Sequence, residues 1–203
     1  MKLLLTGFEP FGESRVNPSE QVVRTLAGRG IEGVQLHTAI LPVDREGGPA
    51  ALLAALDEVR PEAVLCLGEA SRRAAISVER VAINLLDYRI ADNAGNRVVD
   101  QPVVAGGPAA YFVTLPARAI CEAIQGAGIP VELSLSAGAF LCNQVTYVLL
   151  HHLASQQICI PAGFIHLPAL PEQAARQSPA IPSMGLETMV TGIEMAIRVI
   201  HTA

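Results

Sequence analysis

The chain has 203 residues, of which 51% are hydrophobic and only 16% are charged, and its formal net charge is -5 at pH 7. This length fits one domain, residues 1–203, that buries a large core. No cluster of lysine and arginine stands out, which disfavours nucleic acid and membrane as partners. The apolar composition favours surface buried between subunits of a homo-oligomer, a dimer or a tetramer.

Nothing near the N-terminus is typical of a targeting segment. The apolar run at residues 3–5 is much shorter than the core of a signal peptide, and no run approaches the ~20 residues of a membrane span. The four cysteines contain no CxxC pair, which disfavours a disulfide framework and a zinc site. We therefore expect a cytoplasmic protein in which Cys66, Cys121 and Cys159 are reduced thiols of the core.

Segments typical of strands and of helices alternate along the chain. Residues 2–6 predict a buried first strand. Asn17, Pro18 and Glu20 are typical of the N-cap, N1 and N3 positions of a helix with a capping box, which ends near Gly28. The later elements follow in chain order: a strand at 34–41, a helix at 49–59, a strand at 63–67, a helix at 115–127, a strand at 131–135, a helix at 139–154, a strand at 158–167 and a helix at 187–201.

Residues 77–86 are apolar with polar interruptions, and residues 168–185 contain four prolines, which predict an irregular loop. The alternation as a whole predicts an α/β fold. We expect an open α/β/α sandwich, in which helices flank a twisted sheet that is mostly parallel or mixed.

A cysteine and a histidine stand where thiol chemistry is feasible. Cys142 falls in the first turn of the helix expected at residues 139–154, just after the flexible Gly138. Unpaired N–H groups and the positive end of the helix dipole favour a thiolate there. His166 falls at the end of the strand expected at 158–167, where a histidine is more often a buried structural residue. A Cys–His pair, however, is the minimum for thiol-based acyl transfer.

Other candidate residues each allow two interpretations. Phe8 and Phe11 follow the first strand in a loop without the spacing of a phosphate-binding motif; they either cap the core or clamp a flat, neutral ligand at the sheet edge. Glu79, amid apolar neighbours, either pairs with Arg80 in solvent or fixes the tautomer of the histidine. Arg89 is either a surface cation or a group that stabilises an oxyanion.

Together these segments resemble the pyroglutamyl peptidase type I family of cysteine peptidases over nearly the whole chain. The resemblance rests on islands in the same order as in the family: residues 6–12 with 17–18, 41–43, 77–84, 92–93, 136–143, and 163–168 with 171–173. It implies that Cys142 is the nucleophile, His166 the base and Glu79 the carboxylate that orients the base. It also implies hydrolysis of peptides with N-terminal pyroglutamate through a thioester, with no metal and no cofactor.

The resemblance further implies that Phe8 and Phe11 hold the lactam ring. One loop departs from the family pattern: Glu69 stands where the family's glutamine helps hold the lactam, and Arg72 stands where glycine is usual. A carboxylate can still accept the lactam N–H, but burying its charge costs more than burying an amide. Arg72 offsets that charge, or crowds the loop if a positive φ is required there.

Three other functions remain as alternatives. A catalytically silent homologue would bind pyroglutamate-like lactams without turnover. A thiol hydrolase of another small amide would need Cys142 but not the pyroglutamyl ring. A nucleotide-binding Rossmann-like module is disfavoured because the phosphate-loop spacing is missing.

Overall fold

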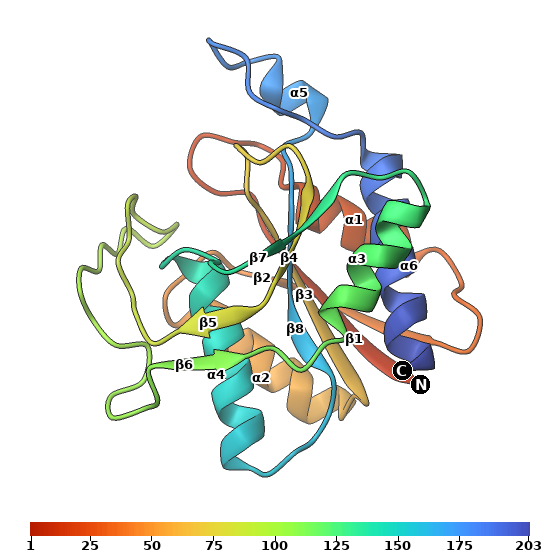
Figure 1. The fold of residues 1–203 in the computed structure, drawn as a ribbon. Coiled ribbons are helices and arrows are strands. Elements are labelled where there is room, and N and C mark those ends of the chain that lie inside the picture. The colour runs from red at the N-terminus through yellow and green to blue at the C-terminus, as the bar shows by residue number, and fades with distance from the viewer.

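The structure is a computed structural model that describes all residues, 1–203. Its centre is a six-stranded sheet in the order β2-β1-β3-β8-β4-β7 (Figure 1). The strands are β1 (Lys2–Phe8), β2 (Gln35–Leu41), β3 (Ala63–Glu69), β4 (Ile76–Glu79), β7 (Val131–Ser134) and β8 (Ala162–Leu167). The sheet is mixed because β4 runs antiparallel to β8, while every other pair is parallel. A separate two-stranded sheet pairs β5 (Val81–Ile83) with β6 (Ala110–Phe112).

Helices cover both faces of the large sheet. They are α1 (Pro18–Ala27), α2 (Gly47–Val59), α3 (Ala117–Gly126), α4 (Leu141–Ser155), the short α5 (Pro171–Ala174) and α6 (Leu186–Thr202). Figure 1 shows α1, α3 and α6 on one side of the sheet, with α2 and α4 on the other. The expected α/β/α sandwich is therefore confirmed, and none of its helices combines the length and the apolar character needed to span a bilayer.

The central strands are continuously apolar because both of their faces are covered. Leu3 and Leu5 pack in the core under α1, α3 and α6, whereas Leu4 packs in the core under α2 and α4. Successive side chains of a strand point to opposite faces, so a strand between two helical layers needs apolar residues at every position. This explains why the strand pattern near the N-terminus does not alternate.

Some details differ from the sequence-based expectations. The helix that begins after Asn17 has the expected N-cap, whose side chain accepts the Ser19 N–H at 3.0 Å. Glu20 forms no capping box, however, because its carboxylate accepts a hydrogen bond from Arg24 one turn later, at 2.9 Å. Cys159 is exposed rather than in the core, because β8 begins only at Ala162.

Four elements were not expected. Strand β4 has four residues and strands β5 and β6 have three each, which is too short for a clear periodic pattern, and α5 is a single turn within the proline-rich loop. The helix expected at residues 139–154 begins at Leu141, which makes Cys142 its second residue.

The topology gathers side chains at one edge of the sheet. Phe8 and Glu69 end the parallel strands β1 and β3, and His166 lies one residue before the end of β8. Glu79 ends β4, two residues beyond Ser77, which pairs with His166. Glu79 and His166 are therefore diagonal neighbours on the same face of the sheet, within reach of long side chains.

Candidate active site

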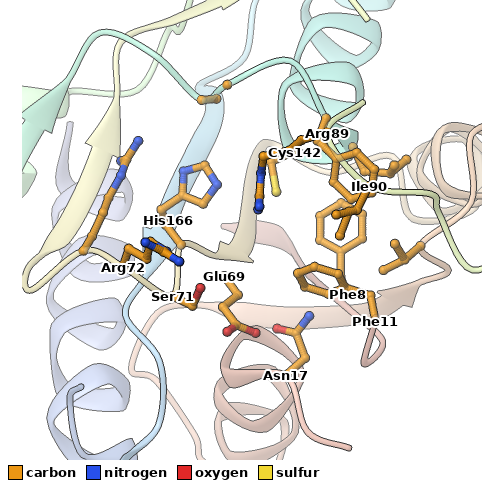
Figure 2. Close-up of a pocket in the computed structure, with 17 residues that line it drawn as sticks. Phe8, Phe11, Asn17, Glu69, Ser71, Arg72, Arg89, Ile90, Cys142 and His166 are labelled. Carbon is orange, nitrogen blue, oxygen red and sulfur yellow. The ribbon is translucent and has the colours of Figure 1, made fainter. Parts of the chain in front are cut away.

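A pocket of about 350 Å³ opens at this edge of the sheet. Six of the seven residues singled out in the sequence line it: Phe8, Phe11, Glu69, Arg89, Cys142 and His166. Figure 2 shows the imidazole of His166 and the thiol of Cys142 facing the same cavity, across from the two phenylalanines. The seventh residue, Glu79, lies behind the pocket wall, where it contacts His166. The topology thus brings the whole predicted set together.

The start of α4 holds Cys142 against the sheet. The chain turns at Gly138, whose φ of 76° is unfavourable for other residues, and then enters the helix through Phe140, which provides no side-chain cap. On the other side of the thiol lies Gly68 of β3, where an added Cβ would be 2.9 Å from Cys142 Sγ. Because Gly68 pairs with His166 in the sheet, the thiol lies close to the β3–β8 pair that carries the histidine.

The imidazole of His166 is buried and oriented by a carboxylate. Its Nδ1 lies 2.7 Å from Glu79 Oε1, and its ring packs at 4.8 Å from that of Phe164. An ionised carboxylate can only accept a hydrogen bond, so the imidazole must donate from Nδ1–H. This places the proton on Nδ1 and leaves Nε2 free to accept a proton from the thiol. This is the tautomer that a general base for a thiol requires.

Glu79 is completely buried and is shared by two donors. Arg73 Nη1 also donates to Glu79 Oε1, at 2.7 Å, while Oε2 has no partner. Burial alone would raise the pKa of the Glu79 carboxyl, but its interaction with His166, with smaller contributions from Ser134 and Arg73, holds that pKa below its ordinary value. No pattern in the sequence had indicated this role for Arg73.

The thiol and the imidazole are both neutral at rest. Burial raises the pKa of the Cys142 thiol to about 12, and the negative charge of Glu79 adds to the effect. Burial also lowers the pKa of His166, against the opposing influence of Glu79. The sequence-based argument that the helix start favours a thiolate does not hold for the resting site, because burial and the Glu79 charge raise the thiol pKa more than the backbone hydrogen bond at Cys142 lowers it. The thiol proton has to leave during the reaction.

The aromatic residues of the pocket differ in their surroundings. Phe8 is almost fully buried and belongs to the core under α2 and α4, so it both caps the core and lines the pocket. Phe11 is more open and lies 6.2 Å from the ring of Phe140, which in turn packs against Tyr88 at 4.6 Å. This aromatic wall suits a flat, uncharged group.

Glu69 is held in place by Gln173, a residue that sequence analysis did not single out as part of the site. Gln173 Nε2 lies 3.1 and 3.2 Å from the two carboxylate oxygens of Glu69, and it also contacts Ser14 and Val16. Burial raises the pKa of the Glu69 carboxyl, and the hydrogen bond from Gln173 opposes this. Gln173 belongs to the segment 171–173, which is part of the family resemblance. That resemblance was the feature of the sequence that could have identified Gln173 as a residue of the site.

Two arginines at the pocket are exposed and make no hydrogen bond or ion pair with other residues. They are Arg72 and Arg89. Arg72 does not have a positive φ, so its side chain causes no backbone strain in the loop where the family usually has glycine. Arg72 also forms no ion pair with Glu69. No group of three or more His, Cys, Asp or Glu side chains could hold a metal ion.

Comparison with known proteins identifies the family. A family model described as "Pyroglutamyl peptidase" matches residues 1–203. The chain is 52% identical over 194 residues to a pyrrolidone-carboxylate peptidase of Vibrio vulnificus, covering 96% of this chain and 90% of that protein. It is 52% identical over 202 residues to one of Gloeobacter violaceus, covering 100% and 98%.

Solved structures agree with the sequence comparisons. Pyroglutamyl peptidase I of Bacillus amyloliquefaciens superimposes with a TM-score of 0.96 at 37% identity, covering 100% of this chain and 97% of that one. A mutant pyrrolidone carboxyl peptidase of Pyrococcus furiosus gives a TM-score of 0.95 at 40% identity, covering 98% and 97%. With its fold and its full length matched in this way, the chain belongs to the pyroglutamyl peptidase family.

Proposed function

We propose that the protein is a cysteine exopeptidase that removes N-terminal pyroglutamate (5-oxoproline) from peptides. The observation that carries this proposal is the hydrogen bond of 2.7 Å from His166 to the buried Glu79, on the wall of the pocket that also holds the Cys142 thiol. A nucleophile, a base and a group that orients the base are the parts that covalent acyl transfer requires. Family membership supports the same activity.

In the proposed reaction, Cys142 Sγ attacks the carbonyl carbon that joins pyroglutamate to the next residue. His166 Nε2 takes the thiol proton and later delivers it to the leaving amine, while Glu79 stabilises the imidazolium formed in between. Backbone N–H groups of the first turn of α4, together with Arg89, stabilise the tetrahedral oxyanion. Water then hydrolyses the thioester, which releases free pyroglutamate and restores the thiol.

The substrate lacks an N-terminal ammonium group, so its recognition cannot depend on a counter-charge for that group. We propose that Phe8 and Phe11 contact the faces of the lactam ring and that Glu69 accepts the lactam N–H. Gln173 supports this role because its side-chain amide donates to both oxygens of the Glu69 carboxylate and holds it in place. The chemistry requires no metal and no cofactor.

The protein is also proposed to act as one domain over residues 1–203, in the cytoplasm and as a homo-oligomer, a dimer or a tetramer. Exposed apolar side chains support subunit contacts, since Phe112 is 73% and Leu135 is 74% exposed. Light scattering of the purified protein tests the oligomer, and a monomeric mass at micromolar concentration would contradict it.

The activity is tested with pyroglutamyl-aminomethylcoumarin under reducing conditions, with prolyl and glutaminyl analogues alongside. The wild type should release the fluorescent amine from the pyroglutamyl substrate alone, and Cys142→Ser should not. Binding of pyroglutamate without turnover would indicate the silent homologue, and equal turnover of the analogues would indicate a hydrolase of other amides. Either result would overturn the proposal.

A further inference from the structure

The side chain of Arg73 connects two parts of the site that come from distant elements. Its Nη1 donates to Glu79 Oε1 at 2.7 Å, and its Nη2 donates to the backbone carbonyl of Ser136 at 2.8 Å. Glu79 ends β4, whereas Ser136 lies in the loop that leads through Gly138 to the start of α4. One guanidinium therefore links the carboxylate that orients the base to the loop that carries the nucleophile.

Arg73 also supplies the only fixed positive charge that Glu79 contacts. The carboxylate is 0% exposed, and its second oxygen has no hydrogen-bond partner. A buried carboxylate is costly unless it is paired, and a neutral imidazole cannot neutralise it. Arg73 is only 28% exposed, so solvent screens this ion pair incompletely.

We propose that Arg73 is a positioning residue of the peptidase, which keeps Glu79 in place as a charged acceptor and fixes His166 relative to the loop of Cys142. The inference rests on the proposed roles of these three residues. Arg73 influences the reaction only through Glu79, His166 and Cys142. Its planar guanidinium suits the task because two of its N–H groups can bind two acceptors at once in a fixed geometry.

The charges around His166 give this role a distinct signature. The imidazole faces Glu79 of β4, and other charged or titratable groups of the site are Glu69 of β3, Cys142 of α4 and the pocket arginines, Arg72 and Arg89. Burial is the main cause of the low pKa of His166, Glu79 opposes it, and the charge of Arg73 lowers that pKa further. Removing the positive charge of Arg73 therefore raises the pKa of His166. As the pH falls, the imidazole then becomes protonated, and stops acting as a base, at a higher pH than in the wild type.

The test compares pH profiles of kcat/KM for Arg73→Gln and Arg73→Lys, with Arg118→Gln as the matched control. Arg118 is exposed on α3 and has no hydrogen-bond partner, so its loss should change neither activity nor profile. Arg73→Gln should lower kcat/KM about tenfold to a hundredfold, mainly through kcat, and should move the acidic limb to higher pH. Arg73→Lys should return the acidic limb to its wild-type position but recover only part of kcat, because an ammonium group is less suited to bridging both acceptors.

An unchanged acidic limb in folded Arg73→Gln would overturn the inference, and so would a Lys variant that behaves like the Gln variant. If Arg73→Gln does not fold, the Lys variant decides alone: reduced kcat with a wild-type limb supports the inference, and a displaced limb contradicts it. Failure of the proposed function gives a different result, because then the wild type is inactive or Cys142→Ala retains activity.

Discussion

Substitution of Gly68 by alanine should displace the thiol of Cys142 while leaving Cys142 itself unchanged. A Cβ at this position would lie 2.9 Å from Cys142 Sγ and 2.6 Å from Phe164 Cζ. Phe164 is fully buried between the sheet and α4, so its ring cannot move away freely. The start of α4 and the thiol therefore have to shift.

The size of the effect follows from these distances. Non-bonded heavy atoms prefer separations of about 3.5–4.0 Å, so Sγ has to move by roughly 1 Å. A misplacement of about 1 Å at a reacting atom costs about a hundredfold in rate. Crowding in a packed core costs about 1–3 kcal/mol, which lowers Tm by about 2–12 °C in a chain of this length.

The assay is turnover of pyroglutamyl-aminomethylcoumarin together with thermal unfolding of the same samples. Gly126→Ala is the matched control, because a Cβ on this exposed helical glycine meets nothing within 4 Å. The control should retain full activity and gain up to about 1 kcal/mol in stability, since alanine is the better helix former. Wild-type activity and an unchanged Tm in Gly68→Ala would refute the position assigned to the thiol.

Two further substitutions test the two carboxylates of the site, Glu79 and Glu69. Glu79→Gln should lower kcat by about 10²–10⁴-fold with little change in KM, because an amide can hold His166 in the wrong tautomer; a loss confined to KM would contradict the role of Glu79. Burial raises the pKa of Glu69, and a protonated carboxyl is a weaker acceptor for the lactam N–H. The wild-type KM should therefore rise as the pH falls through the raised pKa of Glu69. Glu69→Gln should remove this dependence on pH, and a KM that still rises in parallel with the wild type would contradict it.

The fold was predictable because burial on both faces of the sheet leaves a strong pattern. The apolar runs of β1, β3 and β8 and the N-cap at Asn17 identify their elements without any long-range information. The elements that were missed, β4, β5, β6 and α5, have three or four residues and depend on contacts made only in the folded chain. Short segments of this kind carry too little pattern to be distinguished from loops.

The site was predictable only in part, for a similar reason. Cys142, His166 and Glu79 were found through motifs around each residue, and the structure brings them together. The partners of the carboxylates were not found, because Arg73 and Gln173 act through hydrogen bonds across the sheet edge that no local spacing encodes. The protonation of the thiol was misjudged because a helix start is visible in a sequence and desolvation is not.

The most direct test of the central claim is labelling with a pyroglutamyl chloromethyl ketone, followed by mapping of the modified cysteine. Cys159 is the most exposed of the four thiols, so a reagent without the lactam, such as iodoacetamide, should react there first. The pyroglutamyl reagent should instead modify Cys142, with one equivalent abolishing activity and free pyroglutamate protecting the enzyme. Inactivation without a label on Cys142, or a label that pyroglutamate does not prevent, would contradict the account.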